Sequence, residues 1–273
     1  MTAVVKLGPA GNCILTKGEK TLDSIKNLTK VGLNAQEIEF VRGTYMGNEE
    51  AKRVGELAKK LDIELSVHSS YYINLASEDL KKQQESKQRI LDSCERGHHL
   101  GAKEIVFHPA YFGKGDKEKV FQTTKNHILD MIDTIKKKGW NVTLSPETTG
   151  KHSALGSLDE TIRLVRETKC SFNIDFAHLY SRNYGKIDYK EVLDKIQNEL
   201  KPKHIQSHFS NISYTSKGER NHEVLNHHPP FEPLAKEILA RKLNITIISE
   251  SPVTWRDSLK MKGIFERLGY RFD

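Results

Sequence analysis

The sequence of 273 residues contains only three cysteines, and no two of them stand close together. They are Cys13, Cys94 and Cys170. An odd number of widely spaced cysteines argues against a disulfide framework, and the lack of a Cys-x-x-Cys pair argues against a zinc site built from thiolates. We therefore expect reduced thiols with a structural role.

Long apolar runs are absent as well. No stretch approaches the ~18 apolar residues that a membrane-spanning helix requires, and residues 1–10 lack the basic and then apolar order of a secretory signal. We expect a cytoplasmic, nucleoid-associated protein without a membrane partner. Phosphate loops of the types G-x-G-x-x-G and G-x-x-x-x-G-K-[ST] are also missing, which disfavours an open nucleotide-binding sheet.

Positive charge is what the sequence has in excess. It contains 43 lysines and arginines against 36 aspartates and glutamates, which gives a formal net charge of +7. Such a charge suits polyanionic partners such as nucleic acid, although many basic housekeeping enzymes share it. Apolar residues make up 37% of the chain and charged residues 29%, a composition typical of a globular protein with a sizeable core.

Short apolar, β-branched runs alternate with amphipathic stretches along the whole chain, as in repeated βα units. The predicted strands are Val4–Gly8, Gln36–Phe40, Glu64–His68, Glu104–His108, Asn141–Glu147, Ser171–Asp175, His204–His208 and Ile245–Glu250. Helical spacing of apolar residues follows them, for example over Glu49–Lys60 and Ile187–Leu200. This pattern predicts an α/β chain whose residues 1–273 form a single-domain (β/α)8 TIM barrel.

Residue types that bind metals stand at the ends of six consecutive predicted strands. They are His68, His108, Glu147, Asp175 with His178 three residues later, His208 and Glu250. At a single position such a residue is more often an ordinary strand cap or loop residue, but six in succession change the balance. Because the carboxyl ends of all barrel strands meet at one mouth, we expect these side chains to surround a common point.

Carboxylates gathered at one point repel each other unless cations neutralise them. The mixture of imidazole and carboxylate without a thiolate favours zinc, with manganese and iron as alternatives, over magnesium or calcium. The ligands are too many for one tetrahedral ion, so we expect two or three ions. His222, in a predicted loop at Tyr214–His228, is a further candidate ligand, whereas His98 and His99 are interpreted as structural or solvated.

With these residues in place, the chain resembles the endonuclease IV family, the zinc-dependent apurinic/apyrimidinic-site endonucleases. The resemblance covers essentially the whole chain, and its most specific segments are His68–Leu75, Phe107–Pro109, Glu147–Gly150 and Ile174–His178. It implies a DNA-repair enzyme that acts on double-stranded DNA with abasic or damaged sites. Zinc-activated hydroxide would hydrolyse the phosphodiester 5′ to an abasic site and leave a 3′-hydroxyl. A monomer is the default expectation.

The resemblance also assigns roles to single residues. The implied ligands are His68 and His108 for one zinc, Asp175, His208 and Glu250 for a second, and Glu147 as the catalytic carboxylate that bridges the two. The family holds a third zinc with the equivalent of His178 and an Asp-x-His, but the present loop reads Arg220-Asn221-His222. Either Glu219 replaces the missing aspartate, or Arg220 replaces the ion and binds the substrate phosphate. We favour replacement by Glu219, because without a third ion His178 and His222 would have no common function.

Three residues outside the ligand set are implied in DNA binding. Tyr71 corresponds to a family side chain that inserts into DNA at the lesion, Tyr72 stands beside it, and Arg42 follows the second predicted strand. An aromatic pair beside a metal site fits base stacking and the filling of a gap in the duplex. The alternative for an aromatic side chain at a barrel mouth is simple wall packing.

Two other functions stay open at this point. A sugar isomerase or epimerase of the xylose isomerase-like barrels would use similar strand-end ligands around one or two divalent metals, but with fewer histidines. A catalytically silent binder of damaged DNA would keep the ligands for folding alone. A serine hydrolase is disfavoured because no G-x-S-x-G motif is present.

Overall fold

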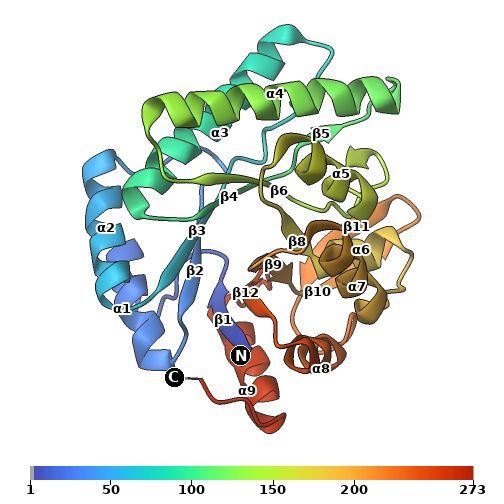
Figure 1. Cartoon of the computed structure of the whole chain (residues 1–273). Coiled ribbons are helices and arrows are strands. Elements are labelled where there is room, and N and C mark those ends of the chain that lie inside the picture. The colour runs from blue at the N-terminus through green and yellow to red at the C-terminus, as the bar shows by residue number, and fades with distance from the viewer. Residues whose placement is uncertain (1–2, 273) are drawn as a thin grey trace.

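The structure, a computed structural model that describes residues 3–272, has a wall of parallel strands surrounded by helices (Figure 1). The wall strands are β1 (Val4–Pro9), β2 (Ala35–Glu39), β3 (Glu64–His68), β4 (Glu104–Phe107), β6 (Thr143–Pro146), β8 (Asn173–Asp175), β9 (Ile205–Phe209) and β12 (Asn244–Ser249). They pair in the orders β1-β12-β9-β8 and β2-β3-β4-β6. Parallel bridges from Ala10 to Glu37 and from Glu147 to Asn173 join the two halves. The predicted (β/α)8 barrel and its strands are confirmed.

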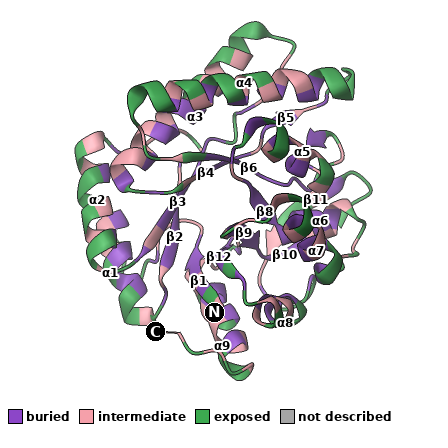
Figure 2. Ribbon diagram, in the orientation of Figure 1, coloured by how far each residue is buried: buried purple, intermediate pink, exposed green. Residues whose placement is uncertain are grey.

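The helices form the outer ring (Figure 1). They are α1 (Thr21–Val31), α2 (Asn48–Lys60), α3 (Leu80–Leu100), α4 (Lys117–Lys138), α5 (Leu158–Thr168), α6 (Phe176–Arg182), α7 (Tyr189–Leu200), α8 (Phe231–Arg241) and α9 (Trp255–Arg267). Figure 2 shows their buried residues on the side of the strands and their exposed residues on the outside. Within residues 3–272, no helix combines the length and the apolar character that crossing a membrane would take.

Helix α2 illustrates how the sequence produces this layer. Ala51, Val54 and Ala58 recur at helical spacing and are buried. Glutamates stand in the first turn and lysines in the last, so each end of the helix carries the charge that its dipole favours. The apolar stripe therefore packs inward, as predicted for Glu49–Lys60.

The three cysteines are buried and free. Burial raises the pKa of Cys13 to about 11 and that of Cys170 to about 12. Because the thiolate is the reactive form, these thiols are inert at neutral pH. Their positions agree with the expectation of reduced, structural cysteines.

The prediction of a loop over Tyr214–His228 is wrong at its beginning. A β-hairpin lies there, in which β10 (Asn211–Thr215) pairs antiparallel with β11 (Gly218–Glu223). The pattern was missed because β11 contains no apolar residue that would mark a strand. A second short pair, β5 (Ala110–Tyr111) with β7 (Ala154–Leu155), was not predicted either. Both pairs extend the chain beyond the carboxyl ends of wall strands.

Candidate metal centre

The strand ends bring the predicted ligands together. His68 ends β3, Asp175 ends β8 and His208 lies in β9, while His108, Glu147 and Glu250 directly follow β4, β6 and β12. Three overlapping groups have ligand atoms within 4.8 Å of one another: His68, His108 and Glu147; Glu147, Asp175, His208 and Glu250; and Asp175, His178, His222 and Glu250. We call them the first, second and third groups.

Glu147 is shared by the first two groups. Its Oε2 lies 3.3 Å from Nε2 of His68 and 3.2 Å from Nε2 of His108. Its Oε1 lies 3.2 Å from Nδ1 of His208. The side chain is fully buried, and the backbone N–H donates a hydrogen bond to the carbonyl of Phe107. One carboxylate thus faces two groups with different oxygens, which is the geometry of a bridging ligand.

Neighbouring oxygens orient the imidazoles of the centre. Nδ1 of His68 lies 2.8 Å from the carbonyl oxygen of Ser69, and Nδ1 of His222 lies 2.7 Å from the hydroxyl of Ser210. A ring nitrogen that donates to such an oxygen leaves the other nitrogen with the lone pair that binds a metal. In both residues that other nitrogen, Nε2, faces a carboxylate of the centre.

The third group differs from the expected set of His178, Glu219 and His222. In the structure, Asp175 and Glu250 form this group together with His178 and His222, whose ring centroids are 5.2 Å apart. Glu219 is not a member of this group. Its Oε2 instead lies 3.1 Å from Nε2 of His178 and accepts a hydrogen bond from the backbone N–H of Gly150 at 3.0 Å.

A β-bulge brings Glu219 to His178. The register of the hairpin shifts between Ser213 and Tyr214, which leaves Arg220 as an extra residue of β11. Side chains alternate between the two faces of a regular strand. Without the bulge, Glu219 and His222, three positions later, would therefore point to opposite faces. Bulges redirect side chains in this way beside functional sites. Arg220 itself is exposed.

The imidazoles balance the negative charge of the centre. Burial opposes ionisation of Glu147, yet His208 and His108 hold its pKa well below the usual value. Burial likewise lowers the pKa of His68, but its hydrogen bond with Glu147 and the charge of Glu39 raise that pKa to about 10. A proton on the His68 imidazole therefore compensates negative charge of the carboxylates, a role that a bound cation would take over.

The donor atoms fit a divalent transition metal. Asp175 Oδ2 and Glu250 Oε2 are buried and have no hydrogen-bond partner among the described residues. Buried oxygens are rarely left without a partner, and a metal ion would supply one. Imidazole and carboxylate donors without a thiolate suit zinc, manganese or iron better than magnesium or calcium.

Sequence reasoning missed two glutamates of β2. Glu37 is fully buried, and its Oε1 lies 2.8 Å from Nε2 of His208. Glu39 is the strand partner of His68, and burial raises its pKa to about 8. The signal was two acidic residues in the segment Gln36–Phe40, because a wall strand buried on both faces is expected to be apolar.

The residues predicted to contact DNA lie at the rim of the centre. Tyr71 is 57% exposed, and its ring centroid is 5.7 Å from that of His68. Tyr72 is 67% exposed, and Arg42 is exposed in the turn that follows β2. Tyr71 is thus both open to solvent and in contact distance of a candidate ligand.

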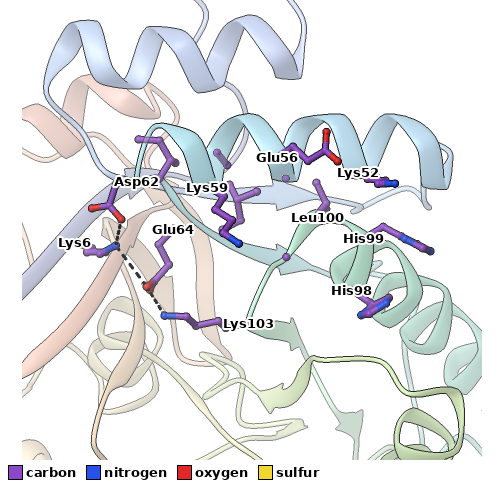
Figure 3. Close-up of a pocket in the computed structure, with 15 residues that line it drawn as sticks. Lys6, Lys52, Glu56, Lys59, Asp62, Glu64, His98, His99, Leu100 and Lys103 are labelled. Atoms are coloured by element: carbon purple, nitrogen blue, oxygen red, sulfur yellow. Dashed lines mark hydrogen bonds and ion pairs between the residues drawn. The ribbon is translucent and has the colours of Figure 1, made fainter.

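A separate cavity of about 460 Å³ lies at the other end of the barrel, between α2 and α3 (Figure 3). Some of its charges pair with each other: Glu64 contacts Lys6 at 3.8 Å and Lys103 at 2.8 Å. His98 and His99 line this cavity, away from the metal centre, in agreement with their interpretation as structural or solvated. Active sites of such barrels lie at the carboxyl ends of the strands, so we assign no function to the cavity.

Comparisons with known proteins agree with this geometry. A model of the family described as xylose isomerase-like TIM barrel matches residues 25–263. An uncharacterized protein of Methanocaldococcus jannaschii is 34% identical over 269 residues, which are 96% of this chain and 97% of the relative. A probable endonuclease 4 of Mesomycoplasma hyopneumoniae is 28% identical over 69% of this chain and 70% of its own. An apurinic-apyrimidinic endonuclease of Caenorhabditis elegans is 29% identical over 49% of this chain and 34% of its own.

Solved structures share the fold. Endonuclease IV from Thermus thermophilus superposes with a TM-score of 0.72 at 19% identity, over 97% of this chain and 98% of that one. A D-tagatose 3-epimerase-like protein superposes with a TM-score of 0.70, also at 19% identity, over 89% and 91%. The fold by itself therefore does not separate nucleases from sugar epimerases. The resemblance to endonuclease IV noted in the sequence is confirmed by the named relatives and this structural neighbour.

Proposed function

We propose that this chain, which belongs to the xylose isomerase-like TIM barrel family, is a zinc-dependent DNA-repair endonuclease that cleaves the phosphodiester bond 5′ to an abasic site and leaves a 3′-hydroxyl. The position of Glu147 carries the proposal, because its two oxygens face two adjoining ligand groups. Two-metal sites that cleave phosphodiesters hold their ions roughly 3.5–4 Å apart. A shared carboxylate sets such a separation.

The residues of the centre would position the groups that this hydrolysis requires. Zinc bound there would bring the pKa of a water molecule near neutrality and neutralise charge that develops on the phosphate. Ser69 and Ser210 hold the imidazoles of His68 and His222 with Nε2 toward the centre. Glu147 joins the first and second groups, and the net charge of +7 attracts DNA to the molecule. Hydrolysis then needs no nucleophile from a side chain.

One observation favours a second function. The second group alone consists of two glutamates, one aspartate and one histidine, which is the composition expected of a sugar isomerase or epimerase. The structural likeness to a D-tagatose 3-epimerase-like protein points the same way. The first group argues for the nuclease, because His68 and His108 add a second set of nitrogen ligands around the shared Glu147.

One assay separates the two functions. The purified chain, supplied with zinc or manganese, is incubated with a duplex that carries a single stable abasic analogue, with the intact duplex, and with a ketohexose. We expect a single cut 5′ to the analogue, a product that a DNA polymerase can extend from its 3′-hydroxyl, and no reaction with the intact duplex or the sugar. Epimerisation of the sugar without strand scission would overturn the proposal.

Tyr71→Ala tests contact with the lesion. We expect affinity for the abasic duplex to fall by roughly tenfold, since stacking of one base on an aromatic ring is worth about 1–3 kcal/mol. Affinity for intact duplex should change little, because a side chain that inserts acts where the duplex is distorted. Both affinities are measured by titration of labelled duplexes. Tyr184→Ala, which removes another tyrosine that is 57% exposed, is the control. Equal losses of affinity for the two duplexes would instead indicate that Tyr71 only packs in the wall of the barrel mouth and does not contact the lesion.

Glu219→Ala and Arg220→Ala separate the two interpretations of the hairpin. Glu219 contacts His178 whereas Arg220 points into solvent. If Glu219 helps to hold a third ion, its removal should lower the metal content by about one equivalent, and Arg220→Ala should leave both metal content and cleavage unchanged. Elemental analysis and a cleavage assay on the two proteins provide the comparison. Slow cleavage by Arg220→Ala, with full metal content in Glu219→Ala, would favour phosphate binding by Arg220 instead.

A further inference from the structure

A buried carboxylate contacts one of the candidate ligands of the second group. Glu37 of β2 and His208 of β9 are both fully buried, and Glu37 Oε1 lies 2.8 Å from His208 Nε2. The other carboxylate oxygen of Glu37 accepts a hydrogen bond from the hydroxyl of Ser66 at 2.7 Å. Ser66 thus holds the carboxylate from one side while the imidazole lies on the other.

The two facing atoms have no alternative partners. Neither Glu37 Oε1 nor His208 Nε2 has a hydrogen-bond partner among the described residues, and the 2.8 Å contact between them is an ion pair outside hydrogen-bond geometry. A buried carboxylate oxygen this close to a buried imidazole nitrogen favours a proton on that nitrogen, because neither atom has another partner. The proton of the neutral imidazole therefore belongs on Nε2, toward Glu37.

This placement leaves Nδ1 of His208 with its lone pair toward the metal centre. Nδ1 lies 3.2 Å from Glu147 Oε1 and 3.4 Å from Glu250 Oε1. Metal-binding imidazoles are held in one tautomer by the partner of their other nitrogen, and a carboxylate partner also makes the imidazole a stronger ligand. Glu37 stands in the place of such a partner.

Three other imidazoles of the centre have a neutral partner at Nδ1. His68 and His178 donate to backbone carbonyl oxygens, of Ser69 and Thr148, and His222 lies against the hydroxyl of Ser210. Among these four, two contact a carboxylate outside the three groups: Glu37 lies 2.8 Å from His208 Nε2, and Glu219 lies 3.1 Å from His178 Nε2. Of these two carboxylates, Glu37 is the one that is fully buried together with its imidazole.

We propose that Glu37 is a positioning residue of the second group: its carboxylate holds His208 in the tautomer that presents Nδ1 to the centre and strengthens metal binding there. The proposal rests on the proposed function in that the second group must bind a metal. It does not depend on which substrate is cleaved.

Glu37→Gln tests the proposal, because glutamine keeps the size of the side chain and removes its charge. Zinc affinity is measured by competition with a chelating indicator, and the cobalt-substituted protein is examined by visible absorption. We expect one ion to bind about 10–100-fold more weakly, the other ions to be retained, and the cobalt bands of one site to change. Ser66→Ala, which removes only the hydroxyl that orients the carboxylate, should give a smaller loss in the same site.

Glu104→Gln is the matched control. Glu104 is another glutamate of the wall, on β4, and it is hydrogen-bonded to Ser145 rather than to a candidate ligand. Its zinc affinity and cobalt spectrum should match those of the wild-type protein. Wild-type affinity and spectrum in Glu37→Gln would overturn the proposal, and so would an equal loss at all sites with the same fall in melting temperature as in Glu104→Gln.

The proposed function can fail separately. A wild-type protein that binds two or more ions without cutting abasic DNA would overturn the endonuclease, while the zinc titration of Glu37→Gln would still decide on the positioning role. If the wild-type protein binds no transition metal at the second group, both proposals are wrong.

Discussion

Glu147→Gln is expected to abolish cleavage of abasic DNA while the barrel stays folded. The carboxylate is fully buried between His68 and His108 on one oxygen and His208 on the other. Glutamine has the same shape, but one of its two terminal atoms is an amide nitrogen that donates hydrogen bonds and cannot bind a cation. The variant can therefore serve only one of the two ligand groups.

The size of the effect follows from the place of Glu147 in the centre. Loss of a residue that merely supports a metal ligand costs about 10–100-fold in affinity or activity, so loss of the shared ligand should cost more than the upper end of that range. Scission of a duplex with one abasic analogue gives the rate, and circular dichroism with thermal melting reports the fold. Turnover by Glu147→Gln at the wild-type rate would remove the bridging role.

Removal of metal is expected to have the second large effect. Purified protein should contain at least two equivalents of zinc or a similar transition ion, because the first and second groups together have too many ligands for one tetrahedral ion. Treatment with a chelator should abolish cleavage and lower the melting temperature. Ions that bind the folded chain but not the unfolded chain stabilise the fold. Each site contributes about 2.7 kcal/mol when the concentration of free metal exceeds Kd a hundredfold.

The loss should be reversible and selective. Zinc added back to the chelated protein should restore both the melting temperature and cleavage, and parallel additions of manganese, iron and magnesium rank the metals by the activity that they restore. The nitrogen ligands of the centre lead us to expect little recovery with magnesium. Elemental analysis that finds one ion or none in fully active protein would contradict the model of a metal cluster.

The barrel and its candidate ligands could be predicted because both follow from local patterns in the sequence. Apolar runs such as Glu104–His108 indicate wall strands, and the following amphipathic stretches indicate helices. Parallel strands that close into a barrel place all their carboxyl ends at one mouth. A residue such as His108 or Glu250 is therefore assigned to the site by its position at the end of a strand, without knowledge of any distance.

Only the tertiary structure decided how these residues meet. The bulge at Arg220 turns Glu219 toward His178, although strand alternation predicts the opposite face. Glu37 faces His208 because β2 and β9, far apart in the chain, both contribute to the interior of one barrel. The physical reason is that a local pattern determines which element a residue belongs to, whereas register, bulges and contacts across the barrel depend on the packing of all the strands at once.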